Sequence, residues 1–499
     1  MIASGMVFPG SNCWVNTLLR VRISSLINSL LFIAEQRYVK TNIPIKVVLP
    51  FLLFSALVPS KQLGFRILHP NFEIMRIFLI FICFFTGISL FAADTRKLDS
   101  LLIHRHFFEL QRELKSNTYS NLPTHRKLYY QAFLHNFFHD LTTSNQEIAL
   151  LLDNYKKEFS HNELSNLLMK KIDNHVKLYQ YREAHLTTQF LLRKYRHVLS
   201  AEERDDARNS DIIWKGLENV PPQTTSVTSE TNISYRRDLA GLINIPVSFA
   251  DSTFDFVFDT GANLSVITES YARKSNLRMM NVRFKVRAIT GLEVYANLGI
   301  ANEFKMGNII VRNAVFMVFP DTALSFARGL YTIKGIIGFP IIEQLQEIRI
   351  NKKTLTVPQF PTDRKLRNFG VDELLPVISI AYNADTLAFT FDTGAQFTFL
   401  NEPFYQDYKK LIDSAGKPFD MQIGGAGGIT KTKAFRLSQI AITVAGQPAL
   451  LKDVAVKTSS STPKDKLYYG NFGQDIMNQF KEMVINFKYM YVDFIPTSP

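Results

Sequence analysis

Two copies of the pentapeptide Phe-Asp-Thr-Gly-Ala occupy residues 258–262 and 391–395 of the 499-residue sequence, and each follows a run of β-forming residues. Asp259 and Asp392 are therefore candidates for a pair of reacting carboxyl groups. Two carboxyls held close together cannot both ionise at low cost, so such a pair shares one proton. The ionised member can take a proton from a bound water while the protonated member donates to a carbonyl oxygen. This chemistry is general acid–base hydrolysis without a covalent intermediate.

The two pentapeptides belong to a longer internal duplication. Around them, apolar and polar residues alternate between turn residues, which predicts strands joined in hairpins. Three landmarks recur in the same order at nearly constant offsets: "IPV" at 245–247 with "LPV" at 375–377, the pentapeptide itself, and "GIIGFPII" at 335–342 with "GNFGQDIM" at 470–477. We therefore expect an all-β, acid-protease-like domain of two pseudo-two-fold-related lobes, the first over residues 237–360 and the second over 361–499.

The duplicated motif is similar to a known active-site loop. In each copy a hydroxyl side chain, Ser265 or Thr398, follows the Ala by three residues, and an apolar-Gly segment comes later, before a short helix. This pattern resembles that of the retropepsin-like aspartic proteases of the clan AA type, in a single-chain, two-lobe form that looks bacterial and carries an N-terminal helical domain. The similarity covers residues 237–499. It implies an aspartic endopeptidase, a hydrolase in which Asp259 and Asp392 activate the water that cleaves a peptide bond.

The resemblance also implies supporting roles for the neighbours of the two aspartates. Thr260 and Thr393 would join the two loops through hydroxyl hydrogen bonds, and Gly261 and Gly394 would let the backbone approach the carboxylates without a Cβ clash. A glycine-containing flap from each lobe would close over a substrate bound as an extended strand. The flap residues are Thr290 and Gly291 in lobe 1, and Gly424, Gly425, Gly427 and Gly428 in lobe 2.

The residue types that are missing narrow the chemistry. Residues 237–499 contain neither His nor Cys, which excludes a Ser-His-Asp triad, a Cys-His pair and a His-based zinc site within the lobes. We therefore expect no cofactor and no metal. A different class of function stays open, namely a catalytically silent module that binds peptides or proteins. The intact pair of Asp-Thr-Gly loops argues against it, because a binder needs neither carboxylate.

Two details of the lobes concern polar residues. The polar Asn471 stands in lobe 2 where lobe 1 has the aliphatic Ile336. Asp372 and Glu373 are adjacent acids, which we interpret as a solvated turn. We expect no phosphate site in the glycine-rich stretch at 424–428, because it lacks the strand-to-helix context of a phosphate-binding loop.

Residues 94–219 show helical periodicity and predict an all-α region of several antiparallel helices. Its aromatic and Ala positions weakly resemble tetratricopeptide-type repeats, but no 34-residue register can be fixed. His135 and His139 have aromatic neighbours and lack an intervening Glu, so we interpret them as packing residues. This region could dock a protein partner, or even carry the main function as a scaffold. A Pro-, Ser- and Thr-rich segment at 220–236 is expected to link it to the lobes.

The N-terminal part predicts export. Residues 75–93 begin with Met and Arg, continue with an apolar run and end in two Ala residues, the layout of a secretory signal peptide. The alternative is an uncleaved membrane anchor. We then expect a periplasmic or secreted protein, or one anchored through 75–93. If translation starts at Met75, residues 1–74 are an upstream segment outside the translated protein, and otherwise they belong to it. The formal charge of +13 is spread along the chain, so we expect no nucleic-acid partner.

Overall fold

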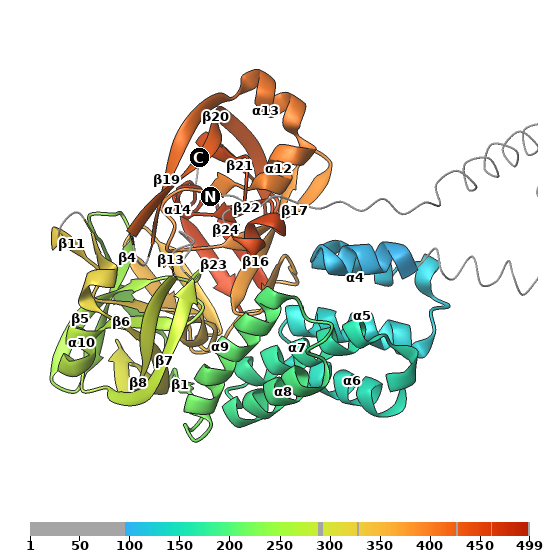
Figure 1. Cartoon of the computed structure of the whole chain (residues 1–499). Coiled ribbons are helices and arrows are strands. Elements are labelled where there is room, and N and C mark those ends of the chain that lie inside the picture. The colour runs from blue at the N-terminus through green and yellow to red at the C-terminus, as the bar shows by residue number, and fades with distance from the viewer. Residues whose placement is uncertain (1–94, 288–292, 327–328, 426–427, 461, 498–499) are drawn as a thin grey trace, which may run out of the picture. The chain divides into compact units, whose positions relative to one another are not determined.

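The computed structural model describes residues 95–287, 293–326, 329–425, 428–460 and 462–497. In this part of the chain a helical region over 95–217 precedes a β-rich region of two lobes, which confirms the predicted fold class (Figure 1). The predicted upstream segment 1–74, the signal or anchor segment 75–93, and Thr290, Gly291 and Gly427 of the predicted flaps lie outside the described residues.

The helical region is a chain of consecutive helices that pack against their neighbours. Residues 95–103 are helical. The helices that follow are α4 (Phe107–Leu114), α5 (Thr124–Phe137), α6 (Leu141–Asn154), α7 (His161–Lys177), α8 (Tyr181–Lys194) and α9 (Ala201–Leu217), with short 3₁₀ turns η1 (Asn117–Tyr119) and η2 (Lys156–Glu158). Their buried Leu, Tyr and Phe side chains form a core that continues into lobe 2 through Val377, Ala388 and Tyr468.

Local capping explains where two of these helices begin. At α7 the Ser160 side chain accepts from the Glu163 backbone N–H while the Glu163 side chain accepts from the Ser160 N–H. The same capping box recurs at α9 between Ser200 and Glu203. Each box satisfies two N–H groups that a helix start leaves without partners. The two boxes stand 40 residues apart, an interval longer than the 34 residues of a tetratricopeptide unit.

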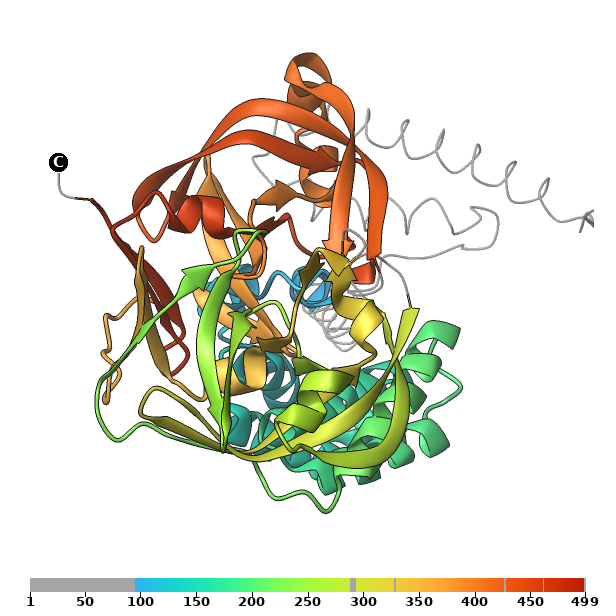
Figure 2. The same ribbon diagram turned by 90° about the vertical axis from the view of Figure 1, so that its left-hand side faces the viewer.

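Each lobe is built on one sheet. Lobe 1 uses β1 (Thr224–Ser226), β3 (Arg236–Arg237), β4 (Ile243–Phe249), β5 (Ser252–Phe258), β6 (Ser265–Thr268), β7 (Arg278–Arg287), β8 (Glu293–Met306), β9 (Ile309–Phe319) and β12 (Gly335–Ile337). Lobe 2 uses β15 (Phe369–Asp372), β16 (Leu375–Tyr382), β17 (Asp385–Phe391), β18 (Phe399–Leu400), β19 (Lys417–Gly425), β20 (Gly428–Val444), β21 (Gln447–Lys457) and β22 (Gly470–Phe472). In Figure 2 lobe 1 is green to yellow, and lobe 2 is orange to red.

The shorter elements complete the lobes. Lobe 1 carries α10 (Glu269–Lys274), η3 (Asp321–Leu324), the small pair β10 (Ser325–Phe326) and β11 (Tyr331–Thr332), and α11 (Phe339–Glu343). Lobe 2 carries α12 (Glu402–Asp407), α13 (Lys409–Ala415), η5 (Pro463–Lys466) and α14 (Gln474–Met477).

The pairing of strands is the same in both lobes, as the duplication predicts. β5 runs parallel to β12, which is antiparallel to β6. β17 likewise runs parallel to β22, which is antiparallel to β18. The hairpin β7–β8 of lobe 1 corresponds to the hairpin β19–β20 of lobe 2, and these are the predicted flap hairpins.

A third sheet joins the two lobes. It consists of β2 (Thr231–Ser234), β14 (Thr354–Val357), β13 (Glu347–Asn351), β23 (Glu482–Asn486) and β24 (Tyr491–Ile495), in that order. Its central pair is β13 of lobe 1 against β23 of lobe 2. The lobes therefore share backbone hydrogen bonds in addition to side-chain contacts.

The segment at 220–236 does more than link the helices to the lobes. Its residues form β1, which pairs with β9, and β2, which pairs with β14 of the shared sheet. β3 starts at its end and pairs with β4. The β-branched Thr and Ile residues within this polar stretch suit strands at the edge of a sheet.

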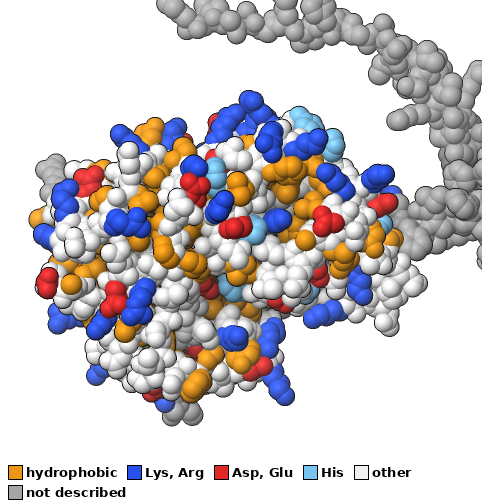
Figure 3. Space-filling model, turned by 90° about the horizontal axis from the view of Figure 1, so that it is seen from below, with side chains coloured by type: hydrophobic (Ala, Val, Ile, Leu, Met, Phe, Trp, Pro, Cys, Tyr) orange, Lys and Arg blue, Asp and Glu red, His pale blue; other side chains and the backbone are white. Residues whose placement is uncertain are grey.

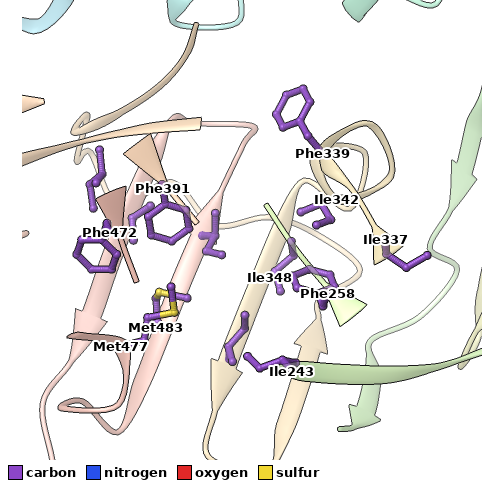
Figure 4. Close-up of a cluster of buried hydrophobic side chains, with 14 of the residues drawn as sticks. Ile243, Phe258, Ile337, Phe339, Ile342, Ile348, Phe391, Phe472, Met477 and Met483 are labelled. Atoms are coloured by element: carbon purple, nitrogen blue, oxygen red, sulfur yellow. The ribbon is translucent and has the colours of Figure 1, made fainter. Parts of the chain in front are cut away.

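Buried side chains beneath the two pentapeptides form one core across both lobes (Figure 4). Phe258 and Phe391, which directly precede the two aspartates, are fully buried. Phe472 stacks on Phe391 at 5.3 Å between ring centroids. Burying a Phe side chain contributes about 2–3 kcal/mol, so the strand ends that carry the aspartates are held firmly from below.

The helical region contacts both lobes. Against lobe 1, the Asn209 side chain of α9 donates to the Lys285 carbonyl at 2.8 Å and accepts from its N–H at 2.9 Å. These bonds satisfy backbone groups on β7, the edge strand of that sheet. Against lobe 2, Phe137 of α5 packs on Gly370, where any Cβ would come within 2.2 Å of the Phe ring.

The interpretation of Asp372 as part of a solvated turn is wrong. Its side chain is buried and lies at the contact between the helical region and lobe 2. It accepts hydrogen bonds from Arg105, from Lys170 at 3.2 Å and from the Tyr468 hydroxyl at 2.7 Å. Opposite charges far apart in the sequence thus make burial of this carboxylate tolerable.

Two further expectations concern surface charge and the histidines of the helical region. On the face in Figure 3, Lys and Arg are interspersed with acidic and hydrophobic side chains. His135 pairs with Glu147 at 2.7 Å and His139 with Glu343 at 2.9 Å, so the two rings face different carboxylates. The absence of a nucleic-acid partner stays a prediction.

Candidate active site

The two pentapeptides meet between the lobes as mirrored loops at the ends of β5 and β17. A strand parallel to each fixes its position: the Asp259 N–H donates to the Ile337 carbonyl and the Asp392 N–H donates to the Phe472 carbonyl, both at 3.0 Å. These acceptors belong to β12 and β22, the apolar-Gly segments of the two lobes. The duplication thus places the candidate aspartates in equivalent positions.

Thr260 and Thr393 lock the loops together with four buried hydrogen bonds. The Thr260 N–H donates to Thr393 Oγ1 and the Thr393 N–H donates to Thr260 Oγ1, both at 3.0 Å. Each hydroxyl in turn donates to a backbone carbonyl of the opposite lobe, Thr260 to Phe391 and Thr393 to Phe258, both at 2.9 Å. Both side chains are fully buried, so their hydrogen bonds are protected from water.

The glycines after the threonines bring each loop against the opposite carboxyl group. A Cβ on Gly261 would lie 2.7 Å from Asp392 Cγ, and one on Gly394 would lie 2.3 Å from Asp259 Cγ. No real side chain tolerates such distances, so both positions require glycine. The crossed contacts also show that Asp259 and Asp392 face each other.

Further hydrogen bonds hold each carboxyl in place. Asp259 Oδ1 accepts from the N–H groups of Gly261 at 2.8 Å and Ala262 at 3.2 Å. Asp392 Oδ1 accepts from the Gly394 N–H at 2.8 Å. The two carboxyls also interact directly with each other. Backbone donors therefore set the outer geometry of a carboxyl pair that is able to share one proton.

The surroundings of the pair favour protonation. Burial, the negative charge of Asp392 and the hydrogen bond to it raise the pKa of Asp259 well above its ordinary value. Burial also raises the pKa of Asp392, while hydrogen bonds from Asn471 and Asp259 act in the opposite direction. Both side chains keep partial exposure to solvent, which a group needs if it is to reach a substrate. The pair can therefore supply one acid and one base together.

The hydroxyl residues after each pentapeptide support the loops from outside. Ser265 Oγ accepts from the Gly338 N–H at 3.0 Å, and Thr398 Oγ1 accepts from the Gly473 N–H at 2.9 Å. Both bonds connect the active-site loop to the start of the short helix, α11 or α14. The sequence pattern singled out both hydroxyls and both glycines.

The flap residues are only partly within the described chain. Gly425 pairs with Gly428 at the end of the β19–β20 hairpin, next to Gly424. Thr290, Gly291 and Gly427 fall outside. The structure thus gives the predicted flap of lobe 2 as a hairpin, and the covering of a substrate by either flap stays a prediction.

Two site residues were not predicted from the sequence. Asn471 Nδ2 donates to Asp392 Oδ2 at 3.0 Å. Gln474 Nε2 donates to the Thr393 carbonyl at 2.7 Å, and Arg237 donates to the Gln474 side chain. The signal was present, because Asn471 is polar where lobe 1 is aliphatic. That the Asn471 side chain points toward Asp392 becomes clear only from the pairing of β22 with β17 in the structure.

Comparison with known proteins agrees with this geometry. Residues 245–341 match the family model described as aspartyl protease. The chain contains an aspartic-protease-like domain. The matched stretch spans most of lobe 1 and includes Asp259, whereas the likeness of lobe 2 rests on its equivalent strands and loop. No curated protein matches the chain.

Two negative findings apply to the described residues alone. No group of three or more His, Cys, Asp or Glu among them is placed to hold a metal ion. In the same part of the chain, no helix combines the length and the apolar character needed to cross a membrane.

Proposed function

We propose that this chain is an aspartic-type endopeptidase in which Asp259 and Asp392 activate water for hydrolysis of a peptide bond. The observation that carries the proposal is the pair of mirrored loops, locked by Thr260 and Thr393, that turn two carboxyls toward each other. The match of residues 245–341 to an aspartyl protease family supports it. A binding module would have no use for two carboxyls whose raised pKa values keep a shared proton.

The reaction needs one acid and one base at the same bond. The ionised carboxyl takes a proton from water as the water oxygen bonds to the carbonyl carbon, and the protonated carboxyl gives its proton to the carbonyl oxygen. The tetrahedral diol then breaks its C–N bond, as a proton is returned to the leaving nitrogen. The substrate would lie as an extended strand between the lobes, under the hairpins β7–β8 and β19–β20.

The test uses the full chain with a mixed peptide library between pH 3 and 8. Asp259→Asn and Asp392→Asn should each abolish cleavage, because the dyad needs both carboxyls. Asp251→Asn, an exposed aspartate in the turn between β4 and β5, is the matched control and should cleave normally. A folded wild-type chain that cleaves nothing, but still binds peptides, would favour the silent module instead. Loss in one aspartate variant alone would contradict a shared dyad.

We also propose that residues 75–93 direct export, so that the protein acts in the periplasm or outside the cell. The support is the charge and apolar pattern of that segment. Mass spectrometry of the mature chain distinguishes the alternatives: a start near residue 94 means a cleaved signal, and an intact segment in the membrane fraction means an anchor. The helical region is proposed to dock substrate or a protein partner.

A further inference from the structure

The two lobes differ in one cross-strand pair beside the aspartates. In lobe 1, Val257 of β5 lies opposite Ile336 of β12. In lobe 2, the equivalent strands place Thr390 of β17 opposite Asn471 of β22. The two pairs are equivalent, because Val257 and Thr390 each stand two positions before the aspartate of their lobe. An apolar pair in one lobe is thus a polar pair in the other.

The polar pair forms a chain of hydrogen bonds that ends on one carboxyl. The Thr390 hydroxyl donates to Asn471 Oδ1 at 2.5 Å. That bond orients the amide, so that Nδ2 points at Asp392 Oδ2, 3.0 Å away. Both Thr390 and Asn471 are buried. A buried amide N–H held in this direction stabilises a carboxylate more than a neutral carboxyl.

Lobe 1 cannot offer Asp259 the same bond. The side chains of Ile336 and Val257 carry no N–H or O–H group. The backbone donors from Gly261 and Ala262 reach Asp259 Oδ1, and Asp392 Oδ1 receives its backbone donor from Gly394. These backbone hydrogen bonds are nearly equivalent in the two lobes. The main difference between the two carboxyls is therefore the amide N–H that Asp392 Oδ2 accepts.

We propose that Asn471, oriented by Thr390, is a positioning residue that makes Asp392 the ionised member of the dyad and leaves the shared proton on Asp259. The inference rests on the proposed function and adds the division of labour within it. Asn471 touches Asp392 and acts on the reaction through that carboxyl.

The assignment fixes where each proton goes. Asp392 takes a proton from water as the water oxygen bonds to the carbonyl carbon, while Asp259 gives its proton to the carbonyl oxygen. In the second step Asp392 gives its proton to the nitrogen as the C–N bond breaks, and Asp259 recovers one from a hydroxyl of the diol. The products are an acid and an amine, and the dyad returns to its starting state.

Other charged groups near lobe 2's loop are engaged elsewhere. Asp475 of α14 accepts from the N–H and hydroxyl of Thr398, at 2.8 and 2.6 Å. Arg237 of β3 donates to Gln474 and Asn478 on and after the same helix. The charged group facing Asp392 from the other lobe is Asp259. Asp475 and Arg237 stay unchanged in the variants below, and Asp259 is replaced equally in the copied-pair variant and in its reference, so a difference between the two in the pKa of Asp392 reports on the Thr390–Asn471 pair.

The first test measures titration without relying on activity. The double replacement Thr390→Val with Asn471→Ile copies the apolar pair of lobe 1. In an Asp259→Asn background, ¹³C NMR of labelled aspartates follows Asp392 alone, and its resonance is identified by its loss on adding Asp392→Asn. The copied pair should raise the pKa of Asp392 by about one unit, a tenfold change in its ionisation constant. In an Asp392→Asn background the same replacement should leave Asp259 unchanged.

If the copied pair leaves the pKa of Asp392 unchanged, the proposal is overturned. A fall in its pKa would also overturn it, because the amide would then present its oxygen to a protonated Asp392 and the roles would be reversed. Thermal melting checks that the variants fold. If the NMR shift is absent in a folded protein, the idea fails whatever the enzyme does.

The second test uses the pH profile of kcat/KM in the otherwise native chain. The copied pair should move the acidic limb upward by about the same one unit. A purely structural role would lower the rate at every pH and leave the limb in place, which would contradict the assignment. If the wild-type chain cleaves nothing, the proposed function fails, while the NMR titration still decides the effect of Asn471 on Asp392.

Discussion

Replacing Thr260 with Val tests the lock between the two active-site loops. Val has nearly the shape of Thr but lacks the hydroxyl, so the change removes the bond to the Phe391 carbonyl and the bond from the Thr393 N–H. Both backbone groups stay buried and lose their partners. An unsatisfied buried group costs about 1–3 kcal/mol, so for the two groups together we expect a loss of about 2–6 kcal/mol in the free energy of unfolding.

The Thr260→Val variant should also lose kcat/KM, and by more than the loss of folded protein alone would cause. The aspartate next to each threonine depends on the loop for its position, and a displacement of about 1 Å can cost roughly 10²-fold in rate. Urea unfolding in an Asp392→Asn background avoids self-cleavage, and kcat/KM is measured with Asp392 intact. Thr443→Val, at an exposed position on β20, is the matched control and should change stability by less than about 0.5 kcal/mol. Equal, small losses for both variants would refute the reasoning.

Three further changes follow from the same structure. Gly394→Ala should abolish activity and lower the melting temperature, since its Cβ would lie 2.3 Å from Asp259 Cγ. Asp372→Asn should cost about 3 kcal/mol in urea unfolding, because Arg105 and Lys170 lose their buried counter-charge. Burial raises the pKa of Asp259 above its ordinary value of 3.8, so the stability of the native chain should fall as pH rises from about 3.8 through the raised pKa. Asp259→Asn removes that dependence, and its melting temperature relative to wild type should increase over this interval.

The local features of the site were predictable from the sequence. The alternation of apolar and polar residues around each Phe-Asp-Thr-Gly-Ala predicts β-strands. The duplication of the motif predicts that Asp259 and Asp392 occupy equivalent positions in the two lobes. The hydroxyls of Ser265 and Thr398 recur at the same spacing, and in the structure they accept from equivalent backbone N–H groups, those of Gly338 and Gly473. These predictions succeed because they depend on short-range pattern and on symmetry.

The features that were missed depend on contacts between distant residues. From its local sequence Asp372 looks like part of an exposed turn, but Arg105 and Lys170, which lie 267 and 202 residues earlier, pack against it in the folded chain. The polar strands β1 and β2 gain their pairing from β9 and β14, which no local periodicity reveals. Asn471, a polar residue where lobe 1 has the apolar Ile336, indicates a buried hydrogen bond, but the sequence alone does not identify Asp392 as its partner.

Carrying both lobes in one chain is what permits the asymmetry at the dyad. When two copies of one lobe come from one gene, any donor added beside one aspartate appears beside the other, and the proton has no preferred carboxyl. Here each lobe has its own codons, so Thr390 and Asn471 can differ from Val257 and Ile336. Giving lobe 1 the polar pair through Val257→Thr with Ile336→Asn should therefore reduce the preference, because both carboxyls would then receive an amide donor. In that variant the pKa values of Asp259 and Asp392, each measured by NMR with the other aspartate replaced by Asn, should move closer together. An unchanged difference between the two pKa values would mean that it does not arise from the Thr390–Asn471 pair.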